Sequence, residues 1–371
     1  MKKIMKFLSQ EVILCVALAL AILSSFFVPI DKSYLDYIDW HTLILLFCLM
    51  VVMAGFQKLN LFLYIGNKLL SFVKNSRQLA LVLVFLPFFF SMLITNDVAL
   101  ITFVPFAIIV LSMAKQEDLL VYIVVLQTIA ANLGSMLTPM GNPQNLYLYG
   151  KSGITLLSFL GITFPYVIFA CVCILALLLF IKKDKIAALD TTASHAEIQN
   201  KKQLLLYCVL FILSLLSVLK IIPQTYLFII VVFSVFIMDA SILEKVDYSL
   251  LFTFIGFFIF IGNIGRLEQF RIFLQSIIDG KEAIVAIIAS QIISNVPAAL
   301  LLSGFTENWT ALIIGTNLGG LGTLIASMAS LISYKMVARE YPHKKASYFR
   351  LFTGLNILLL ILLIIFYYIL K

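Results

Sequence analysis

Residues 132–145 read NLGSMLTPMGNPQN, and residues 317–330 read NLGGLGTLIASMAS. Both stretches begin with Asn-Leu-Gly, and the small polar residues that follow recur in the same order, as N-L-G-x3-T-x3-[NS]-x2-[NS]. Both lie in segments that are otherwise rich in Leu, Ile and Met. The pattern predicts that the chain is built from two copies of one unit.

Landmarks upstream of these stretches extend the repeat. Asp39-Trp40 falls opposite Asp247-Tyr248, and each pair opens a long aromatic and aliphatic run. Further along, Thr95-Asn96 falls opposite Ser294-Asn295. Because these landmarks come in the same order in both halves, we predict two homologous halves. Within the quoted stretches the pairs are Thr138 with Thr323, Asn142 with Ser327, and Asn145 with Ser330.

The composition is that of a membrane protein. Hydrophobic residues make up 63% of the 371 positions and charged residues only 12%, far from the roughly 25% charged residues of soluble domains. Apolar stretches long enough for a spanning helix, which needs about 20 residues, recur from Val12 to Leu370. We therefore predict an all-α polytopic membrane protein whose main partner is the lipid bilayer. The basic residues behind the net charge of +8 sit in short loops, which argues against a nucleic-acid partner.

The apolar pattern predicts two kinds of segment. Interruptions at Thr95-Asn96-Asp97 and at Ser294-Asn295-Val296-Pro297 predict that two of the segments, 78–112 and 282–303, are re-entrant hairpins. Predicted helices cover 12–30, 41–57, 119–149, 156–181, 204–222, 224–240, 248–265, 308–334 and 349–370.

Lys and Arg in short loops favour the cytoplasmic side. The lysines near Met1 and those of the linker that begins at Lys182 place the N-terminus and this linker in the cytoplasm, and Lys371 outside the cell (plasma or inner) membrane. An odd connecting helix then inverts the second copy, as in transporters with inverted-topology repeats. The division is a first membrane repeat at 1–181, a cytoplasmic linker at 182–203, a connecting transmembrane helix at 204–223, and a second, inverted membrane repeat at 224–371.

Both quoted stretches should be broken helices. The prolines at 139 and 143 and the glycines at 319, 320 and 322 interrupt the helices, and such backbone survives in a membrane only where it is buried in protein or lines a wet cavity. Free amides attract anions, while carbonyls with Asn, Ser and Thr oxygens suit a hard cation. For a single Ser or Thr, close helix packing is the favoured explanation, whereas for the paired Asn and Thr set function is favoured. The candidate substrate and ion site consists of Thr95, Asn96, Asp97, Asn132, Thr138, Asn142, Asn145, Ser294, Asn295, Asn317, Thr323 and Ser327.

Asp97 is the sole acid that we place deep in the membrane, at a predicted hairpin tip. An intramembrane acid is costly and is functional by default. Asp97 would carry a proton, bind a cation, or fix the tip as a neutral hydrogen-bonding group. Its counterpart in the other half is Val296, so acid chemistry would be asymmetric. No Arg or Lys falls inside a predicted span, so no fixed positive pocket is expected.

At these residues the chain resembles the ion transporter superfamily, which includes arsenite permeases, citrate and dicarboxylate:sodium symporters and some sodium/proton antiporters. The resemblance rests on ITNDVAL at 94–100, on 132–145, on SNVPA at 294–298 and on 317–330. It implies a homodimer whose hairpins move like an elevator against a scaffold. It also implies sodium at Asn96, Thr138, Asn295 and Thr323, although Asp97 and Val296 stand where the dicarboxylate branch has a third hydroxyl. A tip that carries an acid, as this one carries Asp97, is more similar to the arsenite permease branch.

The expected function is secondary active transport of a small anion such as a carboxylate, an oxyanion or a metalloid, with sodium or protons as coupling ion and no other cofactor. The alternative is a cation/proton antiporter in which Asp97 exchanges the two ions. An intramembrane enzyme is disfavoured, because the sequence shows no His/Glu metal set, Gly-x-Ser-x-Gly elbow or Asp pair.

Overall fold

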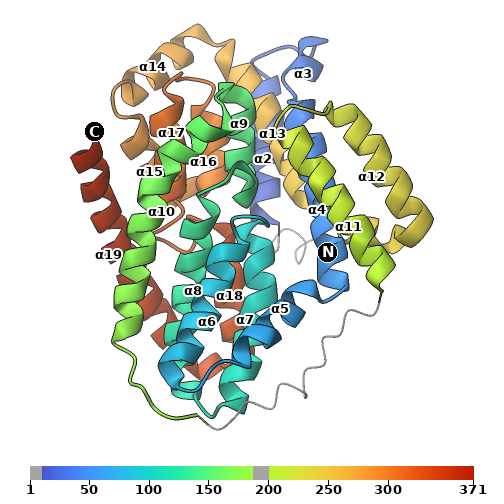
Figure 1. The fold of residues 1–371 in the computed structure, drawn as a ribbon. Helices are drawn as coiled ribbons and strands as arrows, with labels where there is room; N and C mark the ends of the chain where they lie inside the picture. The colour runs from blue at the N-terminus through green and yellow to red at the C-terminus, as the bar shows by residue number, and fades with distance from the viewer. Residues whose placement is uncertain (1–10, 187–199) are drawn as a thin grey trace.

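The computed structural model describes residues 11–186 and 200–371, and within this part the chain is helical (Figure 1). Part of the predicted cytoplasmic linker and Ser194 lie outside the described residues. The helices before the linker are α2 (Val12–Ser25), α3 (Ser33–Asp36), α4 (Trp40–Lys58), α5 (Leu61–Leu70), α6 (Ser76–Phe90), α7 (Asn96–Met113), α8 (Leu120–Ser135), α9 (Pro143–Ser152) and α10 (Leu156–Leu179). After it follow α11 (Lys201–Val218), α12 (Gln224–Asp239), α13 (Tyr248–Gly265), α14 (Glu268–Ile278), α15 (Glu282–Ile293), α16 (Asn295–Leu302), α17 (Trp309–Leu318), α18 (Met328–Glu340) and α19 (Lys345–Leu370).

Among the described residues, eight helical segments are long and apolar enough to cross a membrane. This confirms the prediction of an all-α polytopic membrane protein. They are Trp40–Lys58, Asn96–Met113, Glu117–Ser135, Leu156–Leu179, Lys201–Val218, Gln224–Lys245, Tyr248–Gly265 and Pro342–Leu370.

Three details differ from the predicted pattern. The first helix, α2, ends at Ser25 rather than near residue 30, so its 14 residues fall short of the membrane-spanning length. Two short helices, α5 and α14, follow α4 and α13 where we predicted loops. Each places its apolar residues on one face. Their 10 and 11 residues, with charged neighbours, are well short of the length of a spanning helix, so the apolar pattern did not indicate them.

Aspartates start the matching helices of the two halves. The carboxylate of Asp39 accepts the backbone N–H of Thr42 at 3.1 Å before α4, and that of Asp247 accepts the N–H of Leu250 at 3.0 Å before α13. Each caps an otherwise unpaired amide of a first turn. The Asp39 and Asp247 landmarks of the sequence therefore have a local structural reason.

The chain reverses or breaks at the polar stretches noted in the sequence. It turns between α6 and α7 at 91–95 and between α15 and α16 at Ser294. The predicted helix at 119–149 is divided into α8 and α9, and the one at 308–334 into α17 and α18. Helix α6 packs on α8, and α15 packs on α17. Figure 1 shows α6 and α7 in the lower half of the view and α15, α16 and α17 in the upper half.

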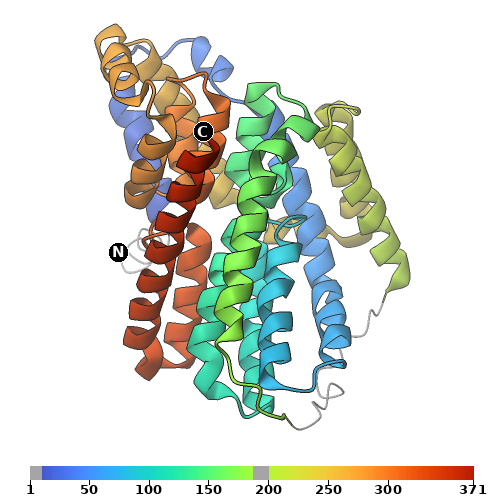
Figure 2. The same cartoon turned by 60° about the vertical axis from the view of Figure 1, so that its left-hand side comes forward.

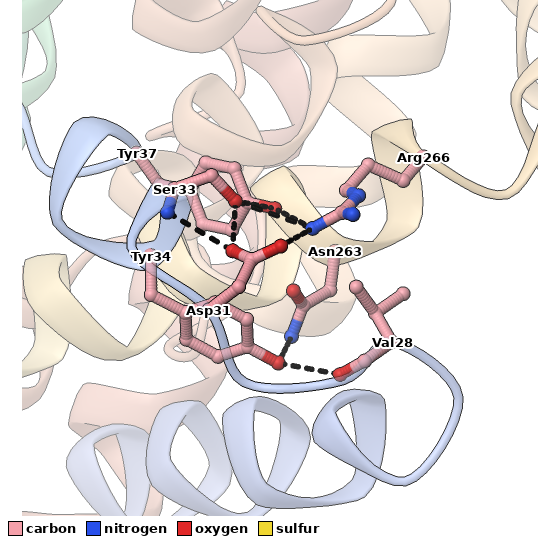
Figure 3. Close-up of polar contacts among 7 residues, drawn as sticks. All are labelled: Val28, Asp31, Ser33, Tyr34, Tyr37, Asn263 and Arg266. Carbon is pink, nitrogen blue, oxygen red and sulfur yellow. Dashed lines mark hydrogen bonds and ion pairs between the residues drawn. The ribbon is translucent and has the colours of Figure 1, made fainter.

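Two long helices flank this centre on one side. Figure 2 shows α10 (green) and α19 (dark red) running side by side, and the rings of Phe169 and Phe366 stack between them with centroids 4.4 Å apart. At one end of the molecule, a polar cluster joins the segment after α2 to the end of α13 (Figure 3). There Arg266 Nη1 donates to Asp31 Oδ2 at 2.9 Å, and Asn263 Nδ2 donates to the Tyr34 hydroxyl at 3.0 Å. The cluster fixes the acidic loop against the second half.

Candidate substrate and ion site

Asn132, in the last turn of α8, connects the two halves of the chain. Its Oδ1 accepts hydrogen bonds from Asn96 Nδ2 at 2.9 Å and from Ser327 Oγ at 3.0 Å. Its Nδ2 donates to Ser330 Oγ at 3.3 Å. Asn132 is 4% exposed, so this amide takes its partners from the protein rather than from water. The contacts join α8, the start of α7 and the start of α18.

A second amide network lies at the start of α9. Asn142 Nδ2 donates to Asn317 Oδ1 at 3.1 Å, and Asn317 Nδ2 donates to Asn145 Oδ1 at 2.6 Å. The Asn145 Nδ2 reaches the backbone carbonyls of Ser135, Met136 and Thr138 at 3.3–3.4 Å. These carbonyls belong to the interruption between α8 and α9, where helical partners are missing. The polar residues of the quoted stretches thus satisfy the broken backbone and each other.

The paired threonines attach the interrupted helices to the neighbouring hairpins. Thr138 Oγ1 donates to the backbone oxygen of Met92, and Thr323 Oγ1 donates to that of Gln291 at 3.2 Å. Gln291 adds to this attachment, because its Nε2 donates to the carbonyls of Gly319 at 3.0 Å and Leu321 at 2.9 Å. Gln291 was absent from our predicted site. Its signal in the sequence was a lone amide in an apolar run, three residues before the Ser294 tip.

The second tip is strained and buried. Ser294 has φ 74° and ψ 155°, a region that non-glycine residues rarely adopt, and it is fully buried. The backbone N–H of the next residue, Asn295, donates to the carbonyl of Ala326 at 2.9 Å. This bond holds the tip against the interruption between α17 and α18. Thr95 at the first tip instead has ordinary extended backbone and caps α7.

A cavity of about 180 Å³ reaches the first tip and is called here the Asp97 cavity. Asp97 Oδ1 is buried and has no hydrogen-bond partner in the described part of the chain. Asp97 thus lines the cavity while one of its carboxyl oxygens has no partner, as a carboxyl group that takes up a cation or a proton requires. Polar residues in its lining are Gln57, Thr95, Asp97, Asn142, Lys245 and Asp247.

Lys245 and Asp247 were not among the predicted site residues. Both are exposed, and both line the same cavity as Asp97. They come from the connection between α12 and α13, which a sequence-based assignment places in a surface loop. Tertiary packing brings this connection against α4 and α7. Two carboxylates beside one ammonium group leave an excess negative charge, which favours a cation or a proton in the cavity.

The remaining predicted residues are distributed around these networks. Of the four residues that the resemblance assigns to sodium, Asn96 and Asn295 lie at different tips, while Thr138 and Thr323 donate their hydroxyl protons to hairpin carbonyls. Thr323 is exposed, whereas Asn96 and Asn295 are buried. A hydroxyl that donates still has oxygen lone pairs for a cation. Among the described residues, no group of three or more His, Cys, Asp or Glu is arranged to hold a metal ion.

Residues 4–308 match the family model described as citrate transporter. The chain belongs to the citrate transporter family. It is therefore a multi-pass membrane protein of a transporter family, and the predicted membership of the ion transporter superfamily is confirmed.

Relatives of this citrate transporter family member come from distant organisms. An uncharacterized transporter of Methanocaldococcus jannaschii is 36% identical over 304 residues, covering 81% of each chain. The inner membrane protein YbiR of Escherichia coli is 30% identical over 316 residues, covering 84% of each chain. A silicon efflux transporter of Oryza sativa subsp. japonica is 34% identical over 132 residues, which is 35% of this chain and 26% of the relative.

Proposed function

We propose that the chain is a secondary active transporter of a small anion, such as a carboxylate, an oxyanion or a metalloid, driven by sodium or protons. The observation that carries the proposal is the Asp97 cavity. It places an unpartnered carboxylate oxygen beside the amide networks at the junction of the two halves. A negative cavity suits a coupling cation, and the amide-rich backbone interruptions suit a polar solute.

Inverted-topology repeats are part of this proposal, and paired contacts support them. Thr138 bonds the Met92 carbonyl as Thr323 bonds the Gln291 carbonyl. Met92 and Gln291 occupy equivalent positions of the two hairpins, as do Ser91 and Ser290, because the members of each pair are equally far apart in the sequence. A Cβ added at Gly134 would overlap Ser91 Oγ, and one added at Gly319 would overlap Ser290 Oγ, so the same close approach occurs twice. In each half, the hairpin therefore docks on the interrupted helix through the same four positions.

Re-entrant hairpins have separate support. The start of α6 and the region after α7 line one surface cleft, together with the end of α10, through Ser76, Gln116, Asp118 and Lys182. Ser76 Oγ donates to the carbonyl of Lys182 at 2.6 Å. Both ends of the α6–α7 hairpin therefore lie at one surface, as a segment that enters and leaves on the same side requires.

The substrate class follows from the site and from relatives. The family model is named for citrate, and one partial relative is named for silicon efflux. Carboxylates and hydroxylated oxyacids share small oxygen-rich shapes that accept hydrogen bonds from amides. We therefore assign this chain a small oxygen-rich solute and expect no metal cofactor beyond the coupling ion.

Liposomes that contain the purified chain test this function. Labelled citrate, succinate, phosphate and arsenite are supplied against imposed sodium or pH gradients. Accumulation of one of them that collapses when the gradient is dissipated supports the proposal. Uptake that equilibrates without dependence on either gradient contradicts secondary active transport.

A cation/proton antiporter is the second candidate, and the Lys245, Asp97 and Asp247 lining of one cavity favours it. In that case an internal pH change follows addition of sodium without any organic solute. The same liposomes with an entrapped pH dye measure this exchange, and a dye signal that requires an anion favours the anion transporter instead.

The assembly and orientation complete the proposal. We propose a homodimer in which the hairpins and interrupted helices move against a scaffold. In the cell (plasma or inner) membrane, the N-terminus and the 182–203 linker are cytoplasmic, and Lys371 is extracytoplasmic. The division at 1–181, 182–203, 204–223 and 224–371 follows this arrangement.

A further inference from the structure

Gln144 is a buried amide that the networks above do not use. It is 1% exposed, and neither Oε1 nor Nε2 has a hydrogen-bond partner among the described residues. Buried Gln127 differs, because its Nε2 donates to the carbonyls of Leu83 at 2.8 Å and Phe103 at 3.3 Å. A buried amide without partners is costly, and such a group indicates an absent ligand, ion or water.

Helices α9 and α16 lie side by side and run in the same direction. At one end, Asn142 bonds Asn317, and a Cβ added to nearby Gly320 would lie 3.0 Å from Asn295 Nδ2. At the other end, the hydroxyls of Tyr147 and Ser303 lie 2.8 Å apart. The two helix N-termini are therefore together near the amide networks, and the middle of α9 meets the C-terminal end of α16 at Ser303.

Gln144 lies on the face of α9 that is directed toward α16. Tyr147 and Lys151 follow Gln144 at helical spacings of three and seven residues, so the three share a face. Both contact Ser303, Tyr147 at 2.8 Å and Lys151 Nζ at 3.5 Å. Gln144 is consequently one turn nearer to the paired N-termini than Tyr147.

The surroundings of Gln144 suit an anion. In the first turn of α9, Pro143 has no N–H and the N–H of Asn145 donates to Asn142 Oδ1. In that of α16, the N–H of Asn295 donates to the Ala326 carbonyl and Pro297 has no N–H. The backbone N–H groups left to a ligand are therefore those of Gln144 and Val296, where the positive ends of two helix dipoles meet.

At the positions equivalent to Asp97 and Gln144 of the first sequence half, the second half has Val296 and Ala329. Helix α9 packs on α16, and α7 packs on α18. The site therefore has two halves that each combine both sequence halves: a Gln144 half of α9 and α16, and an Asp97 half of α7 and α18.

We propose that Gln144, with the first turns of α9 and α16, binds an anionic oxygen of the transported substrate, while the Asp97 half binds the coupling cation or proton. This assignment rests on the proposed anion transport. It predicts that substitution of Gln144 changes substrate affinity without changing ion coupling, and that substitution of Asp97 changes ion coupling.

A second cavity of about 550 Å³, the outer cavity, is lined by Tyr147, Gly150 and Lys151 of α9, and Gln144 is not part of its lining. The Tyr147 ring, one turn after Gln144, packs on Phe258 with centroids 5.5 Å apart. Lys151 Nζ donates to the Tyr147 hydroxyl at 3.0 Å. Asp36 and Asp39 also line the outer cavity, and the Asp39 carboxylate accepts the backbone N–H of Thr42 at the start of α4.

The two cavities occupy matching places in the repeat. Phe258, Ile261 and Gly262 line the outer cavity, and Met50, Met53 and Ala54 line the Asp97 cavity at the equivalent positions of α4. Tyr37 and Asp39 correspond in the same way to Lys245 and Asp247. The outer cavity is therefore the counterpart, in the repeat, of the Asp97 cavity.

Gln144→Leu tests the subsite in the full-length chain, with labelled citrate, succinate and phosphate in liposomes and thermal unfolding in detergent. We expect KM for the transported anion to rise about tenfold or more, because a hydrogen bond to a charged group is lost. The sodium or proton concentration that gives half-maximal stimulation should stay unchanged. Thermal stability should stay equal or rise, because the substitution removes a buried amide that has no partner.

Gln127→Leu is the matched control, since the same change there removes hydrogen bonds and should lower thermal stability without a specific rise in KM. An unchanged KM for Gln144→Leu, or a loss of stability like that of Gln127→Leu, overturns the subsite. If wild-type liposomes exchange only cations, the proposed function fails and the subsite with it. If they transport an anion, KM of Gln144→Leu decides the subsite alone.

Discussion

Ser327 Oγ donates a hydrogen bond of 3.0 Å to Asn132 Oδ1, although the two residues are 195 positions apart in the sequence. Asn132 ends α8 in the first half, and Ser327 precedes α18 in the second. Because both side chains are buried, the bond ties the two interrupted helices together where the Asn96 amide also arrives. The central site is thus held by contacts between the halves.

Asn132→Leu should destabilise the protein and abolish transport. The change removes the acceptor of Asn96 and Ser327 and the donor to Ser330, and each buried partner left unsatisfied costs about 1–3 kcal/mol. Thermal unfolding in detergent measures the loss. Asn356→Leu is the control, because this buried amide donates within its own helix and already leaves Oδ1 unpaired. Equal effects of the two substitutions would contradict a special role for Asn132.

Gly134→Ala should prevent the α6–α7 hairpin from docking on α8. A Cβ there would overlap the backbone oxygen of Phe88 and the Ser91 hydroxyl, and backbone cannot move aside cheaply. We expect a lower unfolding temperature and lost uptake. Gly354→Ala in α19 is the comparison, because the added Cβ meets nothing within 4 Å. The higher helix propensity of Ala should raise the free energy of unfolding by about 0.5–1 kcal/mol. A stable, active Gly134→Ala protein would show that the docking is looser than described.

Asp97→Asn should uncouple transport from its driving ion while leaving the fold intact. The amide keeps the volume of the side chain but cannot carry a proton and loses the charge that binds a cation. Uptake by wild type and variant is measured against pH and sodium gradients, with thermal unfolding as the check on folding. A structural role would instead lower stability and leave the driving-ion dependence as in wild type. Unaltered coupling in the variant would refute the coupling role of Asp97.

The Asp31 and Arg266 pair should make a small pH-dependent contribution to stability. Hydrogen bonds from Ser33 and from Arg266 lower the pKa of Asp31 below its usual value. Because the folded pKa is lowered, the stabilisation is present above the unfolded pKa of about 3.9 and is lost as the pH falls through the folded value. Wild type should therefore exceed Asp31→Asn in unfolding temperature at pH 7, and this difference should shrink as the pH falls below the unfolded pKa. Asp36→Asn on the same exposed segment controls for a general charge effect, and a difference that stays constant throughout an acid titration would be inconsistent with this pair.

Cysteine labelling tests the inverted topology. In a background without the five native cysteines, Ser194→Cys and Lys371→Cys report the sides of the linker and of the C-terminus. An impermeant maleimide should label Lys371→Cys in intact cells and Ser194→Cys only after permeabilisation. Labelling of both from one side would exclude the inversion.

The sequence by itself determined the class of the protein and the positions of its polar interruptions. Apolar runs set the helices because a bilayer leaves backbone groups no other partner. At the interruptions, Pro143 begins a new helix and Gly322 adopts a positive φ, as these residue types allow. The repeated Asn, Thr and Ser residues could be predicted as site residues for the same reason, since polar residues in apolar runs require partners. The short helices α5 and α14 escaped because their pattern is too brief to register as a span.

Only the tertiary structure decided which partners those residues take. Asn132 meets Ser327, Thr323 meets Gln291, and Lys245 and Asp247 join Asp97 through contacts between distant segments. Gln144 was unremarkable in the sequence and became informative only when its burial without partners was visible. Local spacing fixes where a helix starts, breaks or exposes a face, whereas the packing of one helix on another fixes which buried amides are satisfied and which remain open to a ligand.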